Sequence, residues 1–175
     1  PTTSAFLRRQ TSDWLTDNVA GFVALAGVWG GAAKMALALV SGDNMGAPVP
    51  HDYVRPVQRS AASGVWMLPG REFSAPGAAP VIITPSQNFS SSASDIFQLM
   101  GVLNLTQGQY VFKKLGASGE LLDKLPRPPV RTAVFYGSGV KTGRSYVFDA
   151  PRAPAGTPTP SVTLYGDGDG TVNLE

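Results

Sequence analysis

The hydrophobic pattern changes its period three times within the first 40 residues. Over residues 3–18, apolar side chains recur about every 3.6 positions, as on one face of an amphipathic helix. Residues 19–26 form an uninterrupted apolar run, which is typical of a strand buried on both faces of a parallel sheet. Glycines then break the pattern, and residues 32–40 restart as an Ala- and Leu-rich helix. Helix, strand, glycine turn and helix in this order indicate an α/β fold.

The next segment, residues 41–80, has no sustained period. Its Ser-Gly-Asp-Asn stretch and scattered prolines predict an irregular segment, of a length that is typical of a functional lid or of disorder. Trp66 and Met67 lie inside it and argue against simple disorder. We expect Ser94 to cap the helix that follows, and Pro126 to end the one after it. Further along the chain the pattern predicts strands over residues 80–85, 132–136 (again of the buried type), 146–148 and 161–165, helices over 94–100 and 110–125, and a proline-rich connection over 150–160.

Composition narrows the chemistry. The 175 residues favour one domain, and 43% hydrophobic residues are enough for a core. With 14 Lys and Arg against 12 Asp and Glu, and no basic run, the chain lacks the charge pattern of a nucleic-acid binder. The absence of cysteine excludes thiolate metal sites and disulfides, and the single histidine, His51, excludes a histidine cluster. The longest apolar stretch, residues 21–40, is too interrupted for a membrane span.

The sharpest local feature is the sequence Gly-Asp-Gly-Asp-Gly-Thr-Val-Asn at residues 166–173. A calcium-binding loop is disfavoured, because an EF-hand counted from Asp167 needs glycine where Val172 stands. A carboxylate on a turn after a strand can instead orient a catalytic histidine. The third interpretation is an Asp-Gly turn that only satisfies backbone groups. The local sequence leaves the last two open.

Several short motifs together resemble a known family. Residues 25–34, with their Gly-Val-Trp-Gly-Gly core, resemble a "GAPWGG…K" segment of the lecithin:cholesterol acyltransferase family. This family includes a lysosomal phospholipase/transacylase and plant and algal phospholipid:sterol and phospholipid:diacylglycerol acyltransferases. Six further matches follow in the same order, at residues 41–44, 58–60, 66–69, 84–90, 135–139 and 166–173.

The resemblance implies an α/β-hydrolase fold with a cap and a mobile lid, of which this chain is the C-terminal portion. It places hydrolase core at residues 1–40, lid and cap at 41–129, and core again at 130–175. The nucleophilic serine is then expected a few residues before Pro1 and the catalytic histidine beyond the acidic turn. We therefore expect the chain to be a piece of a larger enzyme, inactive by itself. His51 lies in the presumed lid and does not replace the missing histidine.

By position in the motif, Asp169 matches the catalytic aspartate of the family, and Asp167 is its non-catalytic neighbour. Gly168 and Gly170 are expected to allow the tight turn that presents the carboxylate. The resemblance gives three further groups of candidate residues. For the first group the structural alternative is packing at a helix entry, and for the last it is anchoring of the segment. The groups are Trp29, Gly30 and Gly31 near the pocket; Ser41, Gly42, Asp43 and Asn44 in the lid; and Trp66 and Met67 as lipid contacts.

The resemblance implies transfer of a fatty acyl group from a phospholipid to a sterol, diacylglycerol, ceramide or water, at a membrane or lipoprotein surface. It implies neither a metal nor a cofactor. Rival interpretations are an inactive lipid-binding homologue and an esterase of the same fold that acts on soluble esters. Asn88 and Asn104 stand in formal N-glycosylation sequons. Such sequons also occur by chance, and the absence of cysteine argues against a secreted protein. The resemblance therefore favours an endomembrane lumen, a lysosome or vacuole, or a membrane-associated location.

Overall fold

The computed structural model describes residues 2–70, 79–119, 121, 127–149 and 159–174. The chain begins with two short helices, α1 (Thr2–Arg8) and α2 (Ser12–Asn18). The prediction of one continuous helix over residues 3–18 is therefore wrong. Thr11 is extended, and its hydroxyl accepts a hydrogen bond from the Trp14 amide at 3.3 Å, so a new helix begins there. Phe6 and Trp14 still meet edge to face across the break, with ring centroids 5.8 Å apart.

Strand β1 (Phe22–Leu25) and helix α3 (Ala33–Ser41) confirm the predicted order of strand, glycine turn and helix. Up to residue 70, the segment after α3 is not irregular as predicted, because it contains α4 (His51–Ser60) and α5 (Ala62–Trp66); residues 71–78 of that prediction lie outside the described residues. Pro50 directly precedes α4, and Pro56 lies inside it without ending it. The polar contacts of α4 with α3, described below, hold this helix in place despite its internal proline.

Two short strands and two longer helices follow: β2 (Ile82–Ile83), β3 (Asn88–Phe89), α6 (Ala93–Val102) and α7 (Thr106–Ser118). The cap of α6 is Ser92 and not Ser94, since the Ser92 hydroxyl accepts from the Asp95 amide at 3.1 Å. Helix α7 starts earlier than predicted and ends at Ser118, followed by the C-cap Gly119 in the left-handed conformation. Its predicted end at Pro126 lies outside the described residues.

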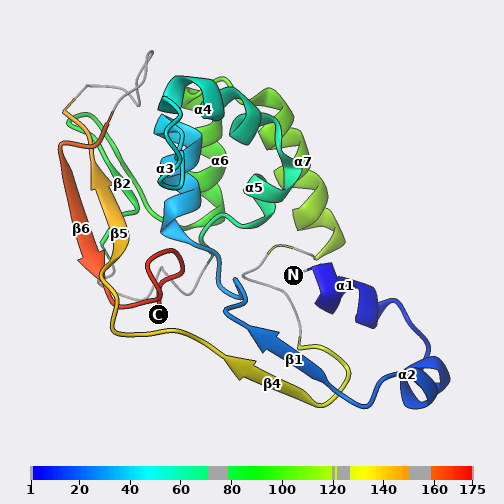
Figure 1. Cartoon of the computed structure of the whole chain (residues 1–175). Coiled ribbons are helices and arrows are strands. Elements are labelled where there is room, and N and C mark those ends of the chain that lie inside the picture. The colour runs from blue at the N-terminus through cyan, green and yellow to red at the C-terminus, as the bar shows by residue number, and fades with distance from the viewer. Residues whose placement is uncertain (1, 71–78, 120, 122–126, 150–158, 175) are drawn as a thin grey trace.

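Strands β4 (Thr132–Phe135), β5 (Thr142–Val147) and β6 (Val162–Gly166) complete two sheets. β1 and β4 pair in parallel as one sheet, and the other has the order β3-β2-β5-β6. Figure 1 shows β2, β5 and β6 beside helices α3 to α7, with β1 and β4 apart from them. The mixed architecture is of the α/β class. β2, from the predicted cap segment, pairs in parallel with β5, from the predicted core segment.

The core lies between α3, α5, α6 and the sheet that contains β2 and β5. Leu39, Ile82, Phe89, Leu99, Met100 and Phe148 are among its most buried side chains. Within the described residues, no helix is both long enough and apolar enough to cross a membrane.

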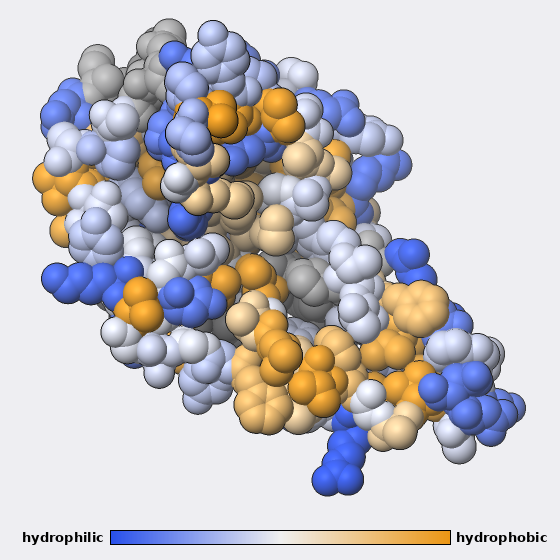
Figure 2. All heavy atoms as spheres, in the orientation of Figure 1, coloured by the Kyte–Doolittle hydropathy of each residue, from blue (hydrophilic) through white to orange (hydrophobic). Residues whose placement is uncertain are grey.

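The sheet of β1 and β4 departs from the prediction of strands buried on both faces. Val23 is 59% exposed and Leu25 72%, and Phe135, which pairs with Leu25, is 60% exposed. The reason is that β1 and β4 contact each other extensively and the other described elements little. Apolar side chains consequently gather on the surface over this sheet (Figure 2).

Candidate functional site

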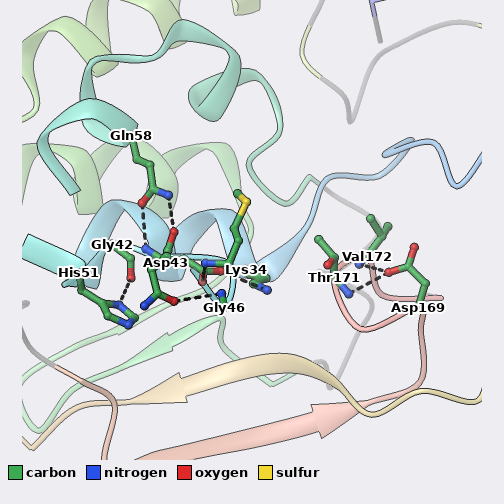
Figure 3. A network of polar contacts seen from close by, with 11 residues as sticks. Lys34, Gly42, Asp43, Gly46, His51, Gln58, Asp169, Thr171 and Val172 are labelled. Carbon is green, nitrogen blue, oxygen red and sulfur yellow. Dashed lines mark hydrogen bonds and ion pairs between the residues drawn. The ribbon is translucent and has the colours of Figure 1, made fainter. Parts of the chain in front are cut away.

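The acidic turn directly follows β6 and is closed by its own backbone. The Asp169 amide donates to the Val172 carbonyl at 3.2 Å, and the Leu174 amide donates to the Asp167 carbonyl at 3.0 Å. One carboxylate oxygen of Asp169, Oδ1, accepts from the amides of Thr171 and Val172 at 2.8 and 2.7 Å (Figure 3). These two hydrogen bonds fix the orientation of the carboxylate relative to the turn.

The second oxygen of Asp169 is left for another partner. Oδ2 accepts no hydrogen bond from any residue that the structure describes, and Asp169 is half-buried. In Figure 3 this oxygen points away from the two amides that hold Oδ1. A carboxylate held through one oxygen, with the other presented outward, has the arrangement needed to accept a hydrogen bond from an imidazole N–H.

Both glycines that flank Asp169 are required by the geometry of the turn. A Cβ at Gly168 would stand 2.3 Å from the Val172 carbonyl oxygen and 2.6 Å from the Thr142 hydroxyl. Gly170 has a φ of 94°, a region that side chains other than glycine rarely adopt. The expectation that these glycines allow the tight turn agrees with this geometry.

Asp167 has a different environment from Asp169. Its Oδ1 accepts from its neighbour's amide, Gly168, at 2.7 Å and from the Gly139 amide at 2.6 Å. The carboxylate is exposed, and it joins the turn to the loop that follows β4. Asp167 thus serves as a tie between two backbone segments.

Asp43, from the Ser-Gly-Asp-Asn motif, is enclosed by its own set of partners (Figure 3). Its Oδ1 accepts from the Met45 amide at 2.9 Å, and its Oδ2 pairs with the Lys34 ammonium at 3.2 Å. The Gln58 side-chain amide bonds the Asp43 backbone at both ends, accepting from its N–H at 2.9 Å and donating to its carbonyl at 2.6 Å. These contacts fasten α4 to the end of α3.

The neighbouring residues strengthen the same junction. Gly42 ends α3 with a φ of 77°, and a Cβ there would lie 2.6 Å from the His51 carbonyl oxygen. The His51 Nδ1–H donates to the Gly42 carbonyl at 2.8 Å. The Arg59 guanidinium donates to the carbonyls of Leu39 and Val40 at 2.7 and 3.2 Å. Burial first, and then the charge of Arg55, lower the pKa of Arg59.

The two remaining residues of this motif differ in their contacts, since the Ser41 hydroxyl is buried without a hydrogen-bond partner among the described residues. Ser41 is buried at the end of α3, and Asn44 shapes the following turn by accepting from the Gly46 amide at 3.1 Å and donating to the Val49 carbonyl at 3.0 Å. The pKa of Tyr146, a buried residue of β5, is raised, first by burial and then by the negative charge of Asp43 and by Tyr165. The Asp43 network therefore extends electrostatically to the sheet.

The structure brings two predicted groups of site residues together. The Ala32 amide donates to the Met67 carbonyl at 3.1 Å, and the Gly70 amide donates to the Gly30 carbonyl at 2.8 Å. Gly31 has a φ of 90°, and a Cβ there would lie 2.3 Å from the Leu68 carbonyl oxygen. The glycine pair thus allows the chain after α5 to pass directly against the entry of α3.

Trp29, directly before this glycine pair, packs against β1. Its ring meets Phe22 at a centroid distance of 6.2 Å, and its indole N–H is buried without a hydrogen-bond partner among the described residues. It lines a cavity of about 340 Å³ together with residues 2–4 of α1 and residues 22–25 of β1. The tryptophan therefore borders an open space at the N-terminal end of the chain.

Both sequon asparagines are exposed. Asn88 lies in β3, and Asn104 has a φ of 56° in the turn between α6 and α7. In the described part of the chain, no group of three or more His, Cys, Asp or Glu side chains is placed to hold a metal ion.

Thr142 and Gln58 were not among the candidate residues from the sequence, whereas Lys34, the lysine of the family-like segment 25–34, was expected to be solvated or ion-paired and does pair with Asp43. Thr142 bonds the acidic turn, and Gln58 and Lys34 complete the contacts of Asp43. Gln58 stands in one of the family-like motifs, which was the available signal for it. Thr142 bonds Gly170 across 28 positions of sequence, and no local pattern links the two.

Comparison with known proteins identifies the class. The model of the lecithin:cholesterol acyltransferase family matches residues 1–114, and this chain belongs to that family. It is 34% identical over 169 residues to the phosphatidylcholine-sterol acyltransferase of Gallus gallus, covering 96% of this chain and 39% of that protein. It is also 32% identical to lecithin-cholesterol acyltransferase-like 1 of Arabidopsis thaliana (97% of this chain, 38% of that protein).

A third relative bears a name with two activities. The lysosomal phospholipase A and acyltransferase of Canis lupus familiaris is 34% identical over 171 residues, covering 97% of this chain and 39% of that protein. The chain thus spans less than two-fifths of the length of these relatives. Acyltransferase and phospholipase are the activities that their names give.

Proposed function

We propose that this chain is part of an acyltransferase or phospholipase that moves a fatty acyl group from a phospholipid to an alcohol or to water. In the complete enzyme a serine attacks the acyl ester, and its proton passes to a histidine; the alcohol of the lysophospholipid leaves with a proton from that histidine. The acyl-enzyme is then attacked by the acceptor hydroxyl or by water, which restores the serine. No step of this scheme requires a metal or a cofactor.

Within this chain, Asp169 is the proposed catalytic residue. The observation that carries the proposal is the unequal use of its two oxygens: Oδ1 is held by two amides, and Oδ2 has no donor among the described residues. An Oδ2 that accepts the Nδ1–H of the histidine would fix its tautomer and stabilise the imidazolium that forms. His51 is not that histidine, because its Nδ1–H is committed to Gly42 and Figure 3 shows it far from Asp169.

The same proposal assigns residues 1–40 and 130–175 to an α/β-hydrolase core, and residues 41–129 to a lid and cap. Trp29, Gly30 and Gly31 are placed at the mouth of the substrate pocket, which fits the cavity that Trp29 borders. Trp66 and Met67 are proposed to contact lipid. Ser41, Gly42, Asp43 and Asn44 form the base of the lid, where their contacts join α4 to α3.

The acceptor is proposed to be a sterol, a diacylglycerol, a ceramide or water, met at a membrane or lipoprotein surface. A lumenal, lysosomal or vacuolar, or membrane-associated location fits these partners. The exposed sequons at Asn88 and Asn104 are available for glycosylation in such a compartment.

The test uses the full-length protein and phosphatidylcholine vesicles that carry labelled acyl chains. Wild type is compared with Asp169→Asn and Asp167→Asn, with a sterol, a diacylglycerol or neither in the membrane. We expect labelled ester or free acid from wild type, and its loss in Asp169→Asn only. Vesicle binding without turnover by folded wild type would overturn the proposal in favour of a lipid-binding homologue. A preference for short soluble esters would contradict the lipid substrate.

A further inference from the structure

The acidic turn is held from outside by one buried side chain. Thr142, the first residue of β5, is 1% exposed. Its hydroxyl donates to the Val140 carbonyl at 2.9 Å and accepts from the Gly170 amide at 2.8 Å. One hydroxyl thus connects the start of β5 with the residue that directly follows Asp169.

The three backbone amides that follow Asp169 donate to two different acceptors. Those of Thr171 and Val172 donate to Asp169 Oδ1, whereas that of Gly170 donates to Thr142. Gly170 lies in sequence between Asp169 and the two residues whose amides bond the carboxylate. The position of Gly170 therefore constrains the positions of the carboxylate and of both amides. Gly168 also packs against Thr142, as a Cβ there would stand 2.6 Å from the hydroxyl oxygen.

We propose that Thr142 is a positioning residue for the Asp169 carboxylate, acting through the Gly170 amide. This inference rests on the proposed function, and it adds a residue that does not touch the reacting groups. The hydroxyl must both donate and accept, because Val140 offers a carbonyl and Gly170 offers an N–H. Valine has nearly the same shape and can do neither, so it would leave both backbone groups without their partner.

Other contacts hold the turn as a whole but do not reach Gly170. The Val140 amide donates to the Gly168 carbonyl at 3.1 Å, and the Asn173 side-chain amide donates to the Gly143 carbonyl at 3.2 Å. These contacts, with the tie from Asp167 to Gly139, should keep the turn folded when the hydroxyl is absent. Removal of the hydroxyl is therefore expected to change the direction of Asp169 Oδ2 while the overall fold is kept.

The experiment compares Thr142→Val and Thr142→Ser in the full-length protein, with the labelled phosphatidylcholine assay. Because misplacement by about 1 Å can cost on the order of 100-fold in rate, we expect Thr142→Val to lower kcat by about 10- to 100-fold with KM unchanged. Thr142→Ser keeps the hydroxyl and should retain most of the activity. Ser145→Ala is the matched control, because Ser145 is a fully buried hydroxyl of the same strand without a hydrogen-bond partner among the described residues.

The pH profile separates positioning from a structural loss. A carboxylate beside a histidine raises the pKa of that histidine, so its displacement should move the acid limb of kcat/KM to lower pH in Thr142→Val. A smaller fraction of folded enzyme would lower the rate at every pH without moving the limb, and would overturn the proposal. Wild-type kcat and an unmoved limb in folded Thr142→Val would do the same.

Two further controls keep the result decisive. If Thr142→Val does not fold, Thr142→Ala, which removes both the hydroxyl and the γ-methyl group, is judged by the same two readouts. Asp169→Asn is assayed in parallel. Activity that survives in Asp169→Asn would refute the proposed function itself, whereas its loss with an unaffected Thr142→Val refutes only the role of Thr142.

Discussion

Two aspartates of this chain, Asp43 and Asp169, lie in glycine-containing turns at the ends of regular elements, and their surroundings differ in one decisive respect. Both oxygens of Asp43 have partners, the Met45 amide and the Lys34 ammonium. Only one oxygen of Asp169 has partners, the amides of Thr171 and Val172. Figure 3 shows the two carboxylates in the same view.

The difference separates a carboxylate that completes the structure from one that can still act. Asp43 is closed to a substrate or a catalytic group, because its Oδ2 is buried and faces the Lys34 ammonium. Asp169 retains the full acceptor capacity of Oδ2 toward an external donor. A motif that contains an aspartate is therefore not by itself a sign of catalysis; the two carboxylates differ in whether the second oxygen is buried against a cation.

The largest expected effect is the loss of turnover when Asp169 is replaced. In the full-length protein, Asp169→Asn should lower kcat on the order of 10³- to 10⁴-fold, because an amide cannot stabilise an imidazolium as a carboxylate does. Its Oδ1 can still accept from both amides, so the melting temperature should change little. Acyl release from labelled phosphatidylcholine measures the rate. A loss below tenfold would contradict the assignment.

The second effect is a loss of stability when Gly42, the residue before Asp43, is replaced. Gly42→Ala should destabilise the protein by about 2–4 kcal/mol, because a left-handed φ and a steric clash with the His51 carbonyl add together. Gly46→Ala is the matched control: its φ is 81°, but a Cβ there meets nothing within 4 Å, so only the conformational cost of about 1 kcal/mol is expected. Urea unfolding measures both. Equal losses would mean that the close approach of α4 to Gly42 does not exist.

The third effect is at Asp43 itself. Asp43→Asn should lower stability by about 1 kcal/mol, since it removes the ion pair with a partly exposed Lys34 and keeps an acceptor for the Met45 amide. Turnover should stay within a few-fold of wild type. Thermal unfolding and the vesicle assay check the two statements together. A collapse of kcat with unchanged stability would assign Asp43 to the chemistry and remove the contrast with Asp169.

The smallest effect is the contribution of Tyr146 to stability, which changes only at alkaline pH. The folded protein raises the pKa of Tyr146, so the native state holds its proton while the unfolded chain loses it above its own pKa of about 10. Stability contributed by this difference is present below pH 10 and decreases as the pH rises beyond it.

Denaturant unfolding at pH 8 and pH 11 measures this decrease, and Tyr146→Phe should reduce it. Asp43→Asn should reduce it in part, because the charge of Asp43 is the second cause of the shift. An unchanged alkaline decrease in Tyr146→Phe would show that another group is responsible.

The fold was predictable where a pattern is local. The glycine break after β1 and the Ala- and Leu-rich α3 follow from residues that are neighbours in sequence. Helix α4 was missed because its prolines argue against a helix, whereas its contacts with α3, through Gln58 and Arg59, come from 15 to 20 residues away.

The site shows the same limit. The acidic motif indicated Asp169, but neither the free oxygen nor the support from Thr142 could be derived from spacing, since Thr142 reaches Gly170 across 28 positions. The exposure of β1 and β4 was also unpredictable, because an apolar run does not specify what packs against it.

The central claim, that Asp169 Oδ2 accepts the N–H of the catalytic histidine, has a direct test in proton NMR. In the full-length protein, an imidazole N–H bonded to a carboxylate gives a resonance far downfield of the backbone amides. The account predicts this resonance in wild type and in Asp43→Asn, and its loss in Asp169→Asn. A downfield resonance that persists in Asp169→Asn but disappears in Asp43→Asn would contradict it, because the roles of the two aspartates would then be reversed.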